Sequence, residues 1–146
     1  MDWKKASDIQ KEIQSLIKKL ELVHIDAKKL ICFRSFGSKS RAGARIWGFP
    51  KVWQKALKIE PHYIIEVLSE KFDRLSANDQ KKVLIHELLH IPKNFSGSLL
   101  PHRGRGGRTI GREVEKMFKK FQNSKVKAQN LSIFHCHSKL DLESIR

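Results

Sequence analysis

The chain has 146 residues and a formal net charge of +15 at pH 7, from 30 lysines and arginines against 15 aspartates and glutamates. A length of this order suits one domain and leaves no room for two independent cores. No apolar run approaches the roughly 20 residues of a membrane span, and residues 1–5 lack the apolar stretch of a signal peptide. Two cysteines, Cys32 and Cys136, are too few for a secreted disulfide scaffold. These features predict one cytoplasmic domain without a membrane segment.

The positive charge is concentrated in two stretches of the chain. Residues 37–58 contain six lysines and arginines and no acidic residue, and residues 93–127 contain ten against two. Such an excess favours a polyanionic partner, so nucleic acid is a candidate partner. Solubility of a lysine-rich protein explains the same charge without any partner.

The first half of the chain is predicted to contain one helix and three strands. Apolar residues at positions 9, 13, 16, 17 and 20 follow the period of an amphipathic helix. Short runs rich in β-branched and aromatic residues predict strands at 30–36, 44–49 and 63–68. A glycine-containing loop at 37–43 separates the first two strands, and residues 51–58 predict one or two helical turns.

The second half is predicted to be helical. Ser76 is a natural N-cap for a helix that runs to Ile91, where Pro92 ends it. After a loop at 93–108, Thr109 caps another helix, with apolar residues on one face as far as Phe121. The pattern weakens beyond Asn123. We therefore expect a domain at 1–122 and a C-terminal tail at 123–146, either mobile or loosely docked as a strand and turn.

His86, Glu87 and His90 form a His-Glu-x-x-His motif in the predicted helix. Residues four apart in a helix lie above one another, so the two imidazoles can bind one ion with the carboxylate beside them. Burying these three side chains unpaired in an apolar helix costs several kcal/mol, and a bound metal ion removes that cost. A chance match is expected about once in a few hundred sequences of this length. The motif therefore predicts one catalytic zinc ion.

A catalytic zinc site takes three protein ligands and leaves one position for water, so a third ligand is needed. His102 is the first choice, because Pro92 ends the helix and the eleven residues between His90 and His102 are enough to turn the chain back. Glu113 on the next helix is the alternative carboxylate ligand. Two histidines of the tail are further alternatives, namely His135 and His137.

The segment 83–92, Val-Leu-Ile-His-Glu-Leu-Leu-His-Ile-Pro, resembles the active-site helix of the phage-type metallopeptidases found in phages, bacteria and archaea. Trp53-Gln54, the Pro61 to Tyr63 segment and His102-Arg103 are also similar, so the resemblance covers roughly 30–121. It implies a minimal zincin-like α+β fold, with a small mixed sheet packed against the N-terminal, active-site and C-terminal helices. It also implies zinc held by the two helix histidines and a later residue.

Metal-assisted hydrolysis of peptide bonds is the predicted activity. Zinc lowers the pKa of its bound water toward neutrality, and Glu87 acts as general base and then protonates the leaving amine. The resemblance implies that the strand at 63–68 provides an edge on which an extended protein or peptide substrate pairs. Three alternatives remain open: a metal-dependent nuclease, a nucleic-acid-binding module with a structural zinc, and a protease acting on nucleic-acid-bound proteins.

Overall fold

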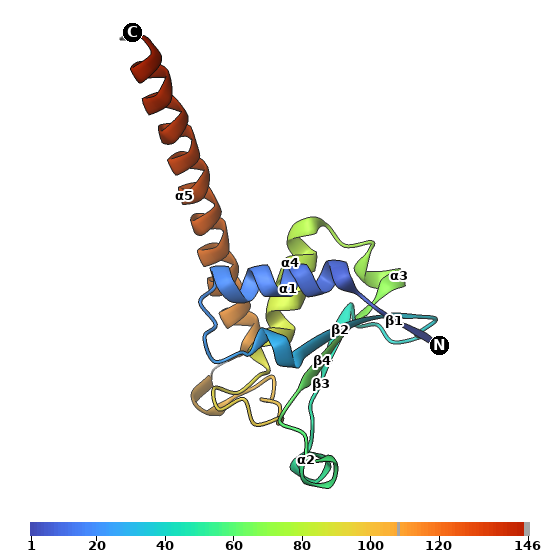
Figure 1. The fold of residues 1–146 in the computed structure, drawn as a ribbon. Coiled ribbons are helices and arrows are strands. Elements are labelled where there is room, and N and C mark those ends of the chain that lie inside the picture. The colour runs from blue at the N-terminus through green and yellow to red at the C-terminus, as the bar shows by residue number, and fades with distance from the viewer. Residues whose placement is uncertain (108, 145–146) are drawn as a thin grey trace.

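A four-stranded mixed sheet forms one layer of the molecule, and helices pack against it (Figure 1). The computed structural model describes residues 1–107 and 109–144, with the backbone alone described for residue 105 and residues 131–144. The strands are β1 (Asp2–Lys5), β2 (Leu30–Phe36), β3 (Ala44–Trp47) and β4 (Tyr63–Leu68), and their order is β1-β2-β4-β3. β2 and β4 are parallel, and the two outer pairs are antiparallel. This arrangement confirms the predicted α+β class.

Helix α1 (Ser7–Lys19) covers the sheet with the apolar face that its sequence period predicts. Ile13 and Leu16 are fully buried, and each aliphatic side chain buried in this way contributes about 1.5–3 kcal/mol. The Gln10 amide also replaces a strand partner for β2. Its Nε2 donates to the carbonyl of Leu30 at 2.7 Å, and its Oε1 accepts from the Cys32 N–H at 3.0 Å. Strand β1, which the sequence pattern did not reveal, pairs with the remainder of β2.

The order of the strands corrects one expectation. The strand at 63–68 was expected to offer an open edge to substrate, but β4 lies between β2 and β3 and is paired on both sides. The outer strand on this side of the sheet is β3, so β3 provides the open edge instead. The pattern of hydrophobic residues along the sequence identifies a strand. Which strands pair with it depends on how the connecting segments pack. Three short elements lie next to these strands. The 3-10 helix η1 (Ala27–Lys29) leads into β2, α2 (Lys51–Leu57) links β3 to β4, and α3 (Ser69–Phe72) follows β4.

Helix α4 (Ala77–Leu89) carries the His-Glu-x-x-His motif across the core. Its N-cap is Ser76, as predicted, and the Ser76 Oγ accepts a hydrogen bond from the Asp79 N–H at 3.2 Å. Three of its apolar residues, Leu84, Ile85 and Leu88, are at most 1% exposed. Because this face is anchored in the core, the side chains on the neighbouring face of α4 are held toward β3 and α5.

Helix α5 (Ile110–Ser144) follows the 3-10 turn η2 (Arg105–Gly107) and packs on α4 and α1. It extends well past the domain (Figure 1), where a mobile tail or a strand and turn had been expected from 123 onward. The helix continues for a local reason: no glycine or proline interrupts the chain from Arg112 to Ser144. Within the described residues, no helix is long and apolar enough to cross a bilayer.

Candidate metal centre

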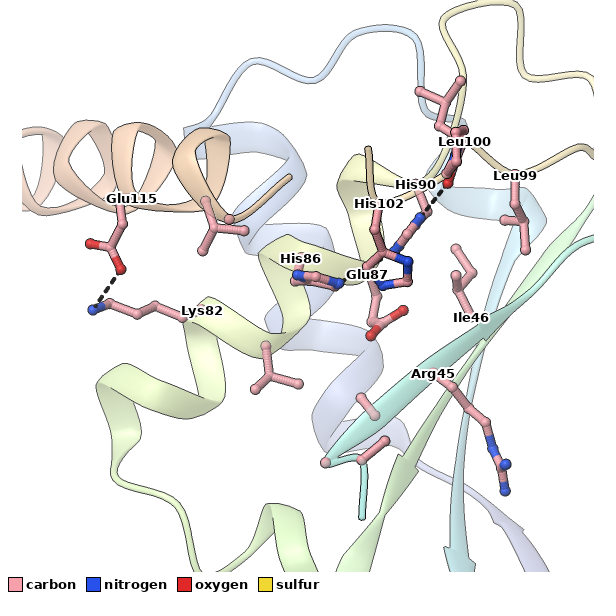
Figure 2. A pocket seen from close by; sticks show the side chains of 17 residues that line it. Arg45, Ile46, Lys82, His86, Glu87, His90, Leu99, Leu100, His102 and Glu115 are labelled. Carbon is pink, nitrogen blue, oxygen red and sulfur yellow. Dashed lines mark hydrogen bonds and ion pairs between the residues drawn. The ribbon is translucent and has the colours of Figure 1, made fainter. Parts of the chain in front are cut away.

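Three imidazoles converge at the C-terminal end of α4. His86 comes from the last turns of the helix, His90 is its C-cap, and His102 comes from the loop that follows (Figure 2). One nitrogen from each ring lies within 4.8 Å of the others, and the Nε2 atoms of His86 and His90 are 3.3 Å apart. His90 is buried, His86 is half-buried and His102 is exposed, so the cluster opens to solvent on the side of His102.

The spacing of two of these nitrogens matches that of ligands on a tetrahedral metal ion. With bonds of about 2.0–2.1 Å, tetrahedral zinc holds two ligand nitrogens roughly 3.3 Å apart. The Nε2 atoms of His86 and His90 already have this separation. The two rings are therefore close enough to share one metal ion.

The His90 ring is oriented from behind by the chain that follows the helix. Its Nδ1 lies 2.5 Å from the carbonyl oxygen of Leu100, and the Leu100 N–H donates to the carbonyl of His90 at 2.7 Å. Because a carbonyl oxygen can only accept, Nδ1 carries the proton and Nε2 is left with a lone pair directed at the cluster. Such a contact fixes the tautomer that a metal ligand requires.

The surroundings favour the neutral form of the two helix histidines. Burial lowers the pKa of His86, and the neighbouring His90 and His102 lower it further. Burial also lowers the pKa of His90, and the hydrogen bond with Leu100 only partly opposes this effect. Neutral imidazoles at neutral pH are ready to bind a cation without first losing a proton.

The carboxyl group of Glu87 is buried beside the histidines. Glu87 is 8% exposed, and burial raises the pKa of Glu87 to about 7, against the opposing effect of a hydrogen bond from the backbone N–H of Ile46. Ile46 lies in β3, so the edge strand of the sheet holds the carboxylate in place. An acid whose pKa lies near neutral pH can both accept and return a proton.

A cleft of about 860 Å³ gives access to these groups. Residues of β3 and the preceding loop form one wall, and α4 and the first turns of α5 form another (Figure 2). Leu99, Leu100 and Pro101 close the end beside His102. The cleft is therefore an open groove between a strand edge and two helices, with the three imidazoles and Glu87 along it.

The profile of the family described as Putative phage metallopeptidase matches residues 1–128. The chain belongs to this family. No curated protein and no solved structure matches it.

Gln54 and Tyr63 lie outside α4, in segments that are similar to those of the phage metallopeptidases. Both side chains hold the loop that leads to His102. Gln54 Nε2 donates to the carbonyl oxygens of Phe49 and Ser96, each at 2.8 Å. The hydroxyl of Tyr63 accepts from the Gly97 N–H and donates to the Ser98 carbonyl, both at 2.8 Å. We call the hydrogen-bonded loop at 96–98 the clamp loop. Gln54 and Tyr63 thus fasten the segment that leads directly to Leu100 and His102.

Glycine is required where the clamp loop meets the turn after β3. Gly97 has φ +92°, and a Cβ there would overlap the carbonyl oxygen of Phe49 and the amide of Gln54. The Phe49 N–H donates to the Gly97 carbonyl at 2.7 Å, which needs close approach of the two backbones. This contact joins the turn after β3 to the clamp loop.

The candidates for a third ligand lie in different places in the structure. His102 is in the histidine cluster, whereas Glu113 is not part of that group. The side chains of His135 and His137 lie outside the described residues. Sequence reasoning missed the Leu100 carbonyl and the Ile46 N–H, because backbone groups leave no residue-type signal. Gln54 and Tyr63 had a signal only as parts of the resemblance.

Proposed function

We propose that this phage metallopeptidase family member is a zinc-dependent peptidase with His86, His90 and His102 as the metal ligands and Glu87 as the general base. The observation that carries the proposal is the convergence of three imidazole nitrogens, within 4.8 Å of one another, beside a buried carboxyl group. Both lie along a cleft that is bordered by an open strand edge.

Zinc is the metal that this donor set favours. Three imidazoles with room for a further ligand are typical of catalytic zinc, whereas magnesium and calcium prefer oxygen donors. When bound, zinc supplies Lewis acidity, which makes water nucleophilic near neutral pH and stabilises negative charge on the carbonyl oxygen. The cluster supplies the neutral imidazoles that hold it.

Glu87 has the position and the environment for proton transfer. With its pKa raised to about 7 by burial, the carboxylate accepts a proton from the attacking water and returns it to the leaving amine at neutral pH. The Ile46 N–H keeps this carboxylate at the boundary between α4 and β3. Proton transfer therefore takes place where the cleft meets the strand edge.

The edge of β3 suits an extended peptide. The Gly43 carbonyl accepts from the Leu68 N–H at 2.9 Å, so the backbone groups of Gly43 face β4. Alternate residues of a strand direct their backbone groups to opposite sides, so Ala44 and Ile46 direct theirs to the open edge. The Ile46 N–H is used by Glu87, which leaves the Ile46 carbonyl and both backbone groups of Ala44 for a substrate. Both residues line the cleft. A substrate strand that pairs here runs past Glu87.

The charges in the cleft favour a peptide over a nucleic acid as substrate. The Arg45 guanidinium points away from the histidines (Figure 2) and binds Glu66 through two hydrogen bonds of 2.8 and 3.1 Å. The Lys82 amine is 3.3 Å from a Glu115 carboxylate oxygen. A nuclease needs cations directed at phosphate, and among the described residues both cationic side chains that line this cleft are already paired with carboxylates.

Metal analysis and proteolysis of matched variants test the proposal. We expect near-stoichiometric zinc and cleavage of denatured casein in the wild type, and zinc without cleavage in Glu87→Gln. His86→Ala should lose both, whereas His62→Ala, which changes a histidine outside the cluster, should keep both. Full activity of Glu87→Gln would exclude the general base. Zinc-dependent cleavage of RNA or DNA in place of casein would favour the nuclease, and bound zinc without any hydrolysis would favour a structural metal.

A further inference from the structure

A second groove, of about 560 Å³, lies between the end of α1 and the middle of α5, and its lining is strongly basic. The end of α1 contributes Lys19 and the adjoining turn contributes Glu21. Helix α5 contributes Lys116, Lys119, Lys120, Asn123, Ser124 and Lys127. Five lysines thus face one acidic residue, and no part of this groove belongs to the histidine cluster. We call it the lysine groove.

The α5 side of the lysine groove is one face of the helix. Its positions follow one another at steps of three and one, which is the spacing that places side chains in a row along an α-helix. From Lys116 to Lys127 the row is about 16 Å long at 1.5 Å per residue. The residues 116–130 contain five lysines and no acidic residue, so the row is not neutralised from within the helix.

Two of the lysines also hold the helices together. The Lys120 amine is 3.5 Å from the Leu20 carbonyl oxygen and 3.6 Å from a Glu21 carboxylate oxygen, so it interacts with the C-terminal end of α1. The Lys19 amine lies 5.1 Å from the centre of the Phe121 ring. Docking of α1 on α5 therefore accounts for these two cations. It does not account for Lys116, Lys119 and Lys127, which are exposed on the same face.

The chemistry of the lining indicates phosphate rather than bases. Its side chains are ammonium, amide and hydroxyl groups, which donate hydrogen bonds to phosphate oxygens. In the part of the chain whose side chains are described, no aromatic residue lines the groove to stack on an unpaired base. A straight row of cations instead matches the regular backbone of a duplex, which carries one negative charge per about 1.7 Å of its axis.

The lysine groove and the cleft share α5. Glu115 lines the cleft, and the next residue, Lys116, lines the groove. Consecutive residues of a helix point to neighbouring faces, so a polyanion in the groove would lie beside the cleft. We propose that the lysine groove binds the phosphate backbone of duplex DNA and so tethers the enzyme near DNA-bound protein substrates. The tether deepens the proposed peptidase function, whereas the DNA binding itself does not depend on that function.

Fluorescence anisotropy with a short labelled DNA duplex tests the binding, in a Glu87→Gln background so that the result is independent of proteolysis. The test variant changes Lys116, Lys119 and Lys127 to glutamine. The matched control changes Lys28, Lys51 and Lys55, three exposed lysines on other parts of the surface, and removes the same charge. Changing the three groove lysines to arginine keeps the charge and should keep the binding. Circular dichroism confirms that each variant is folded.

We expect the parent protein to bind the duplex with an affinity that falls steeply between about 50 and 200 mM salt. The groove variant should lose at least about tenfold in affinity, and the slope of log affinity against log salt should fall by about 2–3. The control variant should change the affinity much less. Equal losses in the two variants, or tighter binding of single-stranded DNA or of polyglutamate than of the duplex, would overturn the proposal. No binding by the folded parent protein at low salt would do the same.

Discussion

The Nδ1 atom of His90 lies 2.5 Å from the carbonyl oxygen of Leu100, ten residues further along the chain. The same contact has two effects. It sets the tautomer of a helix histidine, and it brings the chain back so that His102, two residues later, reaches the other imidazoles. The geometry of the cluster therefore depends on the loop between the helix and His102 as much as on the helix itself.

Tyr63→Phe should weaken metal binding without unfolding the protein. The phenylalanine ring can keep the edge contact with Phe95, whose ring centre is 4.9 Å away, but the hydroxyl that bonds Gly97 and Ser98 is lost. We expect a loss of zinc affinity of about tenfold, measured by competition with a chromophoric chelator. Unchanged zinc affinity together with a lower Tm would show that Tyr63 serves stability alone.

Gln54→Ala and Gln80→Ala form a matched pair. Both side chains donate from Nε2 to a backbone carbonyl, but Gln54 holds the clamp loop and Gln80 bonds Phe72, away from the histidines. Each variant should lose about 1–2 kcal/mol of unfolding free energy in urea. Only Gln54→Ala should also weaken zinc binding. Equal zinc affinities in the two variants would contradict the positioning role of Gln54.

Gly97→Ala should be far more damaging than Gly106→Ala. Both glycines have a positive φ, but a Cβ at Gly97 overlaps the Phe49 carbonyl, whereas a Cβ at Gly106 has open space around it, with no described residue other than its chain neighbours within 4 Å. We expect a loss of about 2–4 kcal/mol for Gly97→Ala and about 1 kcal/mol for Gly106→Ala. Urea unfolding measures both values. Similar losses would mean that the contact between the two loops is loose enough to admit a methyl group.

Glu66→Gln should lower stability in a pH-dependent way. Glu66 is fully buried, and although burial acts to raise its pKa, hydrogen bonds from Arg45 and Trp47 outweigh that effect and lower the pKa of Glu66. Because the folded pKa lies below the unfolded one, the stabilisation is present above the ordinary pKa of glutamate and is lost as pH falls through the folded value.

At pH 7 we therefore expect Glu66→Gln to cost about 1–2 kcal/mol of unfolding free energy, since the partner Arg45 is partly exposed to solvent. The difference from the wild type should shrink in acid, as followed by thermal unfolding across the pH range. Glu60→Gln, which removes an exposed ion pair with Lys29, is the control and should change the Tm little at any pH. A difference for Glu66→Gln that stays constant down to low pH would rule out an ionised Glu66.

The sequence by itself determined the local features of this protein. The helix of the His-Glu-x-x-His motif, its Ser76 cap and the apolar faces of α1 and α5 follow from spacings of three and four residues, and such spacings act within a single element. The separation of His86 and His90 is a consequence of the same helical geometry. The continuation of α5 beyond Asn123 is also determined by local sequence. The apolar pattern fades in this segment, so only the lack of glycine and proline indicates that the helix continues.

The tertiary structure alone decided which backbone groups serve the candidate site. The order of β3 and β4, the Ile46 N–H at Glu87 and the Leu100 carbonyl at His90 join segments that lie between 10 and 41 positions apart in the chain. Every residue except proline carries the same N–H and every residue the same carbonyl, so residue type does not mark these contacts. They form because packing of the core and the clamp loop brings those segments together.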